Sequence, residues 1–165
     1  EASVVKKIQK NTDEVIVGVI GHLYSSNLER GIFKTINGGE TWTKTLFIRE
    51  NTGVIDVAVA PENFNIMYAA SWERERKAWN FDGDGNSSSI YKSIDAGNSW
   101  TKIADKSGFP TGDGVGRIGL AVFNENTVYA LHDSQFRRPK DEAKKASDDL
   151  SKEDFKTMSS ADFLN

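Results

Sequence analysis

The segment from Trp72 to Phe81 carries the side chains best suited to binding chemistry. Within ten residues it holds two arginines, Arg74 and Arg76, and a second tryptophan, Trp79. An indole face stacks on sugar rings, and a neighbouring arginine adds hydrogen-bond donors and attraction to aromatic faces. This combination predicts a binding site for a glycan or for a peptide. The alternative is that the tryptophans are core residues and that the charges are solvated.

An earlier segment, residues 21–30, occupies the corresponding place between a buried strand and the next hairpin. It adds His22, Tyr24 and Arg30 to the candidate ligand-binding residues. Corresponding loops of neighbouring repeats lie side by side in repeat architectures. We therefore expect both segments to line one face of the molecule. The sequence assigns no catalytic residue and no cofactor.

Three oxygen donors at alternate positions, Asp82, Asp84 and Asn86, resemble the start of a calcium-binding loop. Ser87 stands where such a loop needs glycine, and Ser93 stands where it needs a bidentate glutamate. The interpretation is a polar, glycine-rich loop, so no metal site is predicted beyond this weak similarity.

The elements that must position these residues form a repeat. Residues 32–42 match residues 90–100 position for position, and each stretch reads as strand, tight turn and strand. An asparagine or aspartate closes the turn, and a glycine supplies positive φ. The two tryptophans are expected to be buried, because an isolated hairpin cannot cover them. The matching turn residues are Thr35, Asn37, Gly39, Thr41 and Trp42, and Ser93, Asp95, Gly97, Ser99 and Trp100.

The pattern Ser/Thr-x-Asp/Asn-x-Gly-x-Thr/Ser-Trp resembles the Asp-box of BNR-repeat β-propellers. Further segments, such as Gly21–Leu23 and Tyr68–Trp72, resemble a sortilin-like bacterial subfamily often labelled "glycosyl hydrolase, BNR repeat". The resemblance covers about residues 1–133. It implies a propeller in which the Asp-box residues are structural and lie away from the ligand-binding face. Asn37 departs from the aspartate that is usual in the family.

Apolar segments extend the repeat into four-stranded units. We expect a first blade at about residues 4–48, a second at about 54–104 and half of a third at about 117–132. The predicted fold class is all-β, a partial β-propeller whose blades have four antiparallel strands. Because closed propellers have at least about four blades, we expect a piece of a longer protein. The remaining blades would be partners, supplied by the same protein or by another copy.

Residues 134–165 differ in composition from the rest of the chain. They are rich in charged residues and in good helix formers, and β-branched residues are almost absent. We interpret them as a short polar helical insertion or tail, with a disordered segment as the alternative.

The net charge and the length of the apolar runs limit the partners that we expect. A formal net charge of −3 gives no reason to expect nucleic acid as a partner. The sequence also has no apolar run long enough to span a bilayer, so no membrane span is predicted.

The leading functional hypothesis is a non-catalytic binding or scaffolding propeller that recognises protein or glycan. We expect an extracytoplasmic location, which is periplasmic, on the outer surface or secreted. Sialidase chemistry needs an arginine cluster with a tyrosine nucleophile, and the sequence shows no such arginine motif. The alternative is a glycoside hydrolase, sialidase-like or a lyase, whose active site lies largely in blades outside this chain. A purely structural role is the third possibility.

Overall fold

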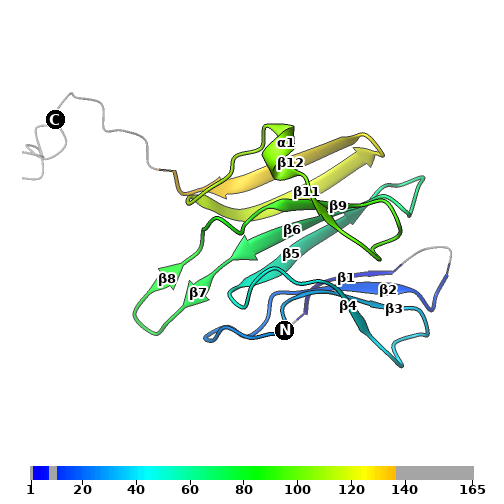
Figure 1. Ribbon diagram of the computed structural model, residues 1–165, viewed down its shortest axis with the longest axis horizontal. Coiled ribbons are helices and arrows are strands. Elements are labelled where there is room, and N and C mark those ends of the chain that lie inside the picture. Colours follow the sequence, from blue (N-terminus) through cyan, green and yellow to red (C-terminus); the bar gives the residue numbers. More distant parts are fainter. Residues whose placement is uncertain (1, 8–10, 137–165) are drawn as a thin grey trace, which may run out of the picture.

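The computed structural model describes the backbone of residues 2–7 and 11–136, and the side chains of residues 11–136. Two four-stranded antiparallel sheets and a two-stranded hairpin follow one another along the chain (Figure 1). From residue 137 onward, the segment predicted to be helical or disordered lies outside the described residues.

Each large sheet is a simple up-and-down arrangement in which strands consecutive within the sheet pair antiparallel. This is the topology of a propeller blade, so the predicted all-β class with four antiparallel strands to a blade is confirmed. The first sheet contains β1 (Ala2–Lys7), β2 (Val15–Val19), β3 (Gly31–Thr35) and β4 (Thr43–Leu46). The second contains β5 (Thr52–Val59), β6 (Met67–Glu73), β9 (Ile90–Ser93) and β10 (Thr101–Lys102).

The remaining elements are short, apart from the last hairpin. That hairpin pairs β11 (Val115–Asn124) with β12 (Thr127–Ser134). A small hairpin pairs β7 (Glu75–Arg76) with β8 (Phe81–Asp82), and one helical turn forms α1 (Ala104–Ser107). Within the described part of the chain, no helix has the length and apolar character needed to cross a bilayer.

Two local features go beyond what the sequence predicts. The segment after Glu73, which carries candidate binding residues, contains the β7–β8 hairpin. Its strands are two residues long, which is too short to show an alternating pattern. The last strand of the second sheet ends at Lys102, and α1 follows from Ala104 and closes on Gly108 in the left-handed conformation.

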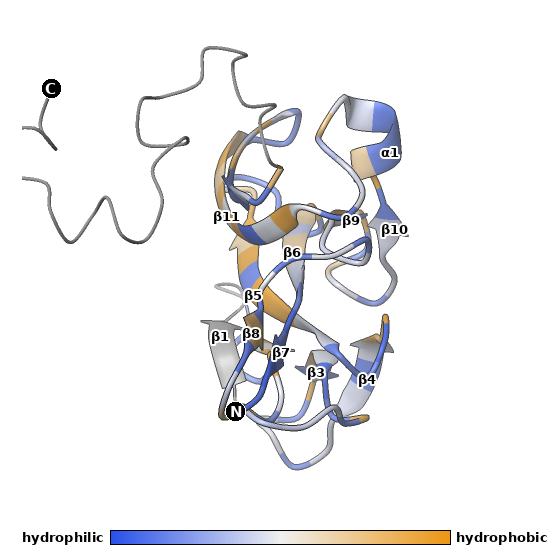
Figure 2. Cartoon of the chain, turned by 90° about the vertical axis from the view of Figure 1, so that its left-hand side faces the viewer, coloured by the Kyte–Doolittle hydropathy of each residue, from blue (hydrophilic) through white to orange (hydrophobic). Residues whose placement is uncertain are grey.

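Three layers bury two apolar clusters (Figure 2). The first cluster lies between the two large sheets, and the second lies between the second sheet and the β11–β12 hairpin. Strand β6 contributes alternate residues to both clusters, so it is apolar throughout rather than alternating. The first cluster comprises Ile16, Ile32, Val54, Val57, Met67 and Ala69. The second comprises Tyr68, Ala70, Ile90, Val115 and Ile118.

The two tryptophans of the repeat have different environments. Trp100 packs against the first cluster, and its Nε1 donates to Thr45 Oγ1 at 3.2 Å. Trp42 is 44% exposed, so the prediction that it is buried was wrong. The physical reason is that Trp100 leans on the preceding sheet, whereas no sheet precedes the first one in the described residues.

Gly53 sets the closest approach between the large sheets. A Cβ atom on Gly53 would lie 2.5 Å from the Cα atom of Ile20 and 2.8 Å from its carbonyl oxygen. Real Cβ atoms do not come so close to backbone, so any side chain at this position would push the sheets apart.

We predict that Gly53→Ala lowers the free energy of unfolding by about 1–3 kcal/mol, through overpacking against β2. Gly119→Ala is the matched control, because a Cβ atom on that strand glycine meets nothing within 4 Å. It should be neutral or stabilise by up to about 1 kcal/mol. Urea unfolding of both variants measures the difference, and equal effects would contradict the role given to Gly53.

Candidate functional site

The strand connections form two opposite ends of the layered sheets (Figure 1). The loop end, at the left of the view, contains residues 21–30, 47–51 and 74–89. The turn end, at the right, contains residues 11–14, 36–42, 60–66 and 94–100.

A hydroxyl side chain organises each of the two repeated turns. Ser93 Oγ accepts from the amide of Gly97 at 2.8 Å and donates to Asp95 Oδ1 at 2.8 Å. Thr35 Oγ1 makes the same contacts with Gly39 at 3.0 Å and with Asn37 Oδ1 at 2.8 Å. The two turns are therefore held by equivalent hydrogen bonds.

The acidic residue distinguishes the second turn from the first. Asp95 accepts from the Ser99 hydroxyl at 2.6 Å and from the Ser99 amide at 2.9 Å. These two hydrogen bonds are the main reason why the pKa of Asp95 falls to about 2. In the first turn, Asn37 makes the corresponding contacts with Thr41, at 2.9 Å and 3.0 Å, without a charge.

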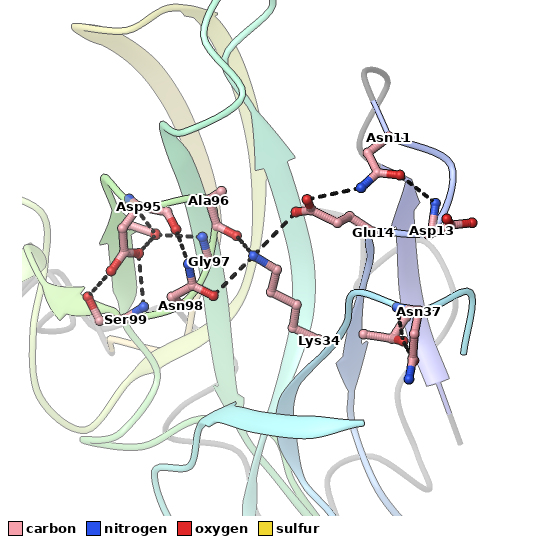
Figure 3. A network of polar contacts seen from close by, with 12 residues as sticks. Asn11, Asp13, Glu14, Lys34, Asn37, Asp95, Ala96, Gly97, Asn98 and Ser99 are labelled. Carbon is pink, nitrogen blue, oxygen red and sulfur yellow. Dashed lines mark hydrogen bonds and ion pairs between the residues drawn. The ribbon is translucent and has the colours of Figure 1, made fainter. Parts of the chain in front are cut away.

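Lys34 joins the first sheet to the turn of the second (Figure 3). Its side chain is 6% exposed. The ammonium donates to Ala96 O and Asn98 Oδ1, both at 3.0 Å, and lies 3.5 Å from Glu14 Oε2. A cavity of about 650 Å³ beside it is lined by residues of the turn end, among them Ile36, Phe64 and Ile94. Three acceptors match the three hydrogens of the ammonium, so we assign Lys34 to holding the sheets together.

Arg30 is the central residue of the loop end. Its side chain is 2% exposed. Its guanidinium donates to the carbonyl oxygens of Asn51, His22 and Ser25 at 3.1, 3.2 and 3.0 Å, while Nε has no partner. Burial, and then the charge of Arg74, lower the pKa of Arg30. Arg30 therefore anchors its loop to the connection that precedes β5, a structural role that the sequence did not indicate.

Asn51 links the loops of the two large sheets. Its carbonyl oxygen accepts from the Arg74 amide at 3.0 Å as well as from Arg30. Its side-chain amide donates to Glu73 Oε1 at 2.9 Å. The structure thus brings Arg30 and Arg74 together around one backbone carbonyl.

Glu73 connects Asn51 to the segment that follows the β7–β8 hairpin. Its second carboxylate oxygen accepts from the hydroxyl and the amide of Ser87, at 2.6 and 3.0 Å. Burial acts to raise the pKa of Glu73, but these hydrogen bonds, the donation from Asn51 and the charge of Arg49 outweigh it, and the pKa is lowered. Glu73 is therefore a fixed acceptor at the base of the hairpin.

Three of the candidate residues lie on the β7–β8 hairpin or beside it. Trp72 stands at its base, where Nε1 donates to Gly83 O at 2.7 Å and the indole meets Phe81 edge-on at 6.1 Å. Arg74 lies 5.6 Å from the Trp72 ring, and Arg76 lies 5.5 Å from the Phe81 ring. Beyond this stack of cations and aromatics, Trp79 is 83% exposed. Trp79 is therefore not a core residue.

The other two candidates lie on the shorter loop. The His22 ring is 3.5 Å from Glu29 Oε2 and 3.5 Å from Ser25 Oγ. Tyr24 is exposed. The structure therefore places both on the loop that Arg30 anchors.

A cavity of about 350 Å³ lies between the loops of the two sheets. It is lined by Ser26, Arg49, Glu50, Asn51 and Glu75. Among these, the side chain of Asn51 donates to Glu73, and Glu75 lies 3.3 Å from Lys77 Nζ. Hydroxyl, amide, carboxylate and guanidinium groups together offer both donors and acceptors to a polar ligand.

Sequence reasoning missed the residues that line this cavity. They come from three separate connections and form no local motif, so only their meeting in three dimensions reveals them. The one local signal is that residues 49–51 join two strands by a short polar connection.

Two of the three oxygen donors compared with a calcium loop have separate partners. Asp82 accepts two hydrogen bonds from Asn80, both of 3.1 Å, and Asn86 donates to Asp113 at 2.5 Å. Among the residues that the structure describes, no three His, Cys, Asp or Glu side chains gather to hold a metal ion.

The fold defines the class of protein, an all-β chain built from blade-type antiparallel sheets. No protein-family model and no curated protein matches the sequence. Among solved structures, the chain is similar to an ancestral GH74 enzyme, with a TM-score of 0.47 and 19% identity over 80% of this chain. The chain spans 13% of the length of that structure. Membership of the Asp-box and sortilin-like families stays a prediction from the sequence.

Asp95 should make stability depend on pH. Because its pKa falls from 3.8 unfolded to about 2 folded, its contribution is present above about pH 4 and is lost as the pH falls toward 2. The carboxylate is solvent-screened, so we expect roughly 1 kcal/mol or less. The free energy of unfolding of Asp95→Asn should therefore approach that of the original protein as the pH falls from about 4 to 2. Urea unfolding at several pH values measures this difference. Asn37→Asp should create the same dependence in the first turn, and a parallel pH response in all three proteins would contradict it.

Lys34→Met should lower the free energy of unfolding by about 1–3 kcal/mol, because it leaves Ala96 O and the Asn98 side chain without their donor. Lys102→Met is the control, because that ammonium lies in solvent with one partner, Asp105, at 3.0 Å. It should change stability by less than about 0.5 kcal/mol. Chemical denaturation distinguishes them, and a Lys34 variant as stable as the control would exclude the role given to the ammonium.

Proposed function

We propose that this chain is part of a non-catalytic binding propeller that recognises a glycan at its loop end. The observation that carries the proposal is the exposure of Trp79 on the hairpin held by the Trp72–Phe81 contact. A large aromatic side chain on a braced hairpin offers a flat apolar surface that a ligand can cover. An extracytoplasmic location belongs to the same proposal and rests on the Asp-box resemblance.

The nearby cavity supplies the polar half of such a site. Sugar hydroxyl groups both donate and accept hydrogen bonds, and the cavity offers Arg49 as a donor and Glu50 and Glu75 as acceptors. Glu75 belongs to β7, so the cavity and the hairpin are continuous. A ligand that stacks on Trp79 can therefore extend along the hairpin toward the cavity. These groups favour a glycan over an apolar peptide as the ligand.

A glycoside hydrolase is the second candidate, and one observation favours it. Two carboxylates, Glu50 and Glu75, line the same cavity, and glycoside hydrolysis uses a pair of carboxylates. Under this alternative, Glu50→Gln and Glu75→Gln would each abolish turnover. Under the binding proposal, the protein releases every bound glycan unchanged.

Trp79→Ala should weaken binding to the best ligand of a glycan panel by about tenfold or more, because it removes the stacking surface. Phe123→Ala is the matched control, since Phe123 is an aromatic residue of similar exposure on β11. It should leave affinity unchanged. Calorimetry with the purified chain provides the affinities.

Three other outcomes would overturn the proposal. Equal affinity of the Trp79 variant and the original protein would remove the hairpin from the site. Preference for peptides over every glycan would replace the ligand class. Cleavage of a bound glycan, lost in Glu50→Gln or Glu75→Gln, would establish the hydrolase instead.

A further inference from the structure

The first of the two repeated turns contains an asparagine that is followed by a glycine. This pair is Asn37 and Gly38, and every other asparagine in the chain precedes a residue with a side chain or is the last residue. Because glycine has no Cβ atom, its backbone nitrogen is uncrowded and can attack the side-chain amide carbon of the preceding asparagine. Asn37 is therefore the asparagine of this chain most prone to deamidation.

Deamidation at this position needs no reagent other than water. The Gly38 nitrogen gives up its proton and bonds to Cγ of Asn37, and the side-chain nitrogen takes up a proton and leaves as ammonia. The product is a five-membered succinimide ring. Water then opens the ring at one of its two carbonyl carbons. Opening at Cγ gives aspartate, whereas opening at the main-chain carbonyl carbon gives isoaspartate, in which the main chain runs through Cγ.

The folded turn holds both reacting groups in other contacts. The Gly38 amide donates to Asp13 O at 2.9 Å, so the loss of its proton also breaks this hydrogen bond. The Asn37 side chain accepts at Oδ1 from Thr35 Oγ1 at 2.8 Å and from the Thr41 amide at 3.0 Å. Its Nδ2 donates to Thr41 Oγ1 at 2.9 Å. Ring closure breaks these contacts, so the reaction requires that the turn first opens.

The two products differ in how well they fit the turn. Aspartate leaves the backbone unchanged, and the second turn shows its contacts, since the Ser99 hydroxyl donates to Asp95 at 2.6 Å. The Thr41 hydroxyl can donate to an aspartate at residue 37 in the same way. Isoaspartate adds a carbon atom to the main chain between Thr35 and Gly39, which are joined by a hydrogen bond of 3.0 Å. This lengthening displaces the two partners from each other.

We propose that Asn37 is a site of spontaneous modification that the folded turn protects, and that only the aspartate product restores the turn. Deamidation converts the neutral first turn into the acidic form that the second turn has at Asp95, and it adds one negative charge. The extent of modification depends on how often the first turn opens. This inference is independent of the proposed glycan binding, because the turn lies at the opposite end of the sheets from the loops.

The first test compares deamidation of the full chain, folded and in urea, at the same mildly alkaline pH. Mass spectrometry of the fragment that contains Asn37 should show a rate at least about tenfold higher in urea, because the unfolded chain has no closed turn.

Gly38→Ala is the matched control for the chemistry. The equivalent residue of the second turn is Ala96, with a φ of 57°, and a Cβ atom on Gly38 would meet nothing closer than Asp13 Oδ1 at 3.8 Å. The variant should therefore keep the fold. In urea it should deamidate about tenfold more slowly than the original protein, because the added Cβ atom crowds the attacking nitrogen.

Thr41→Val tests the hydrogen bonds that hold the asparagine. The substitution removes the acceptor of Asn37 Nδ2 and keeps the branched shape of an exposed side chain. We expect deamidation of the folded protein to become about fivefold faster, while the rate in urea is unchanged. Thr43→Val, at another exposed threonine, is the control and should leave both rates unchanged.

The products are compared after the urea has been removed and they have been separated by ion exchange. The aspartate product should unfold at the same urea concentration as recombinant Asn37→Asp protein. The isoaspartate product should unfold at a lower concentration.

The proposal fails on any of three results. Equal rates in the folded and unfolded chain would remove the protection by the turn. Modification of another asparagine as fast as Asn37 in urea would remove the special status of this site. Equal stability of the two products would remove the preference of the turn for aspartate.

Discussion

The close approach of β5 to the end of β2 is the constraint on which the remaining structure depends. Gly53 lets the two backbones meet without a side chain between them, and the apolar faces of both sheets then share one cluster around Ile16 and Met67. A sheet with apolar residues on both faces is not stable alone in water. Each sheet therefore depends on packing against its neighbour. The connections between strands then lie at the two ends of the packed sheets.

The two ends use polar groups in opposite ways. At the turn end, Thr35, Lys34 and Asp95 direct their donors and acceptors to neighbours within the protein, so the apolar layers are framed by closed turns. At the loop end, Arg30, Asn51 and Glu73 hold the bases of the connections together. Beyond these contacts, Tyr24 and Trp79 are exposed to solvent. A rigid frame with an open rim is the usual arrangement of binding loops on a stable scaffold.

The sequence predicted the fold because the repeat and the apolar runs are local signals. Two hairpins with the same turn residues adopt the same backbone conformation. The apolar run from Met67 to Ala70 is buried on both faces of β6. The features that the sequence did not predict depend on contacts with distant parts of the chain. Burial of Trp42 depends on a neighbouring sheet, and the anchoring role of Arg30 depends on the carbonyl of Asn51, which lies on another connection. No spacing rule encodes contacts of that range.

The two connections that follow a second strand show how one scaffold position acquires a different use. In the first sheet, Arg30 binds three carbonyl oxygens, which hold its loop and the connection before β5 together. In the second sheet, Trp72 and Phe81 contact each other across the base, and the chain between them forms a hairpin that ends in the exposed Trp79. The first connection is thus held by a buried guanidinium, whereas the second is held by an aromatic contact at the base of its hairpin. The ligand surface that we propose therefore lies on the second connection, although both begin from equivalent strands.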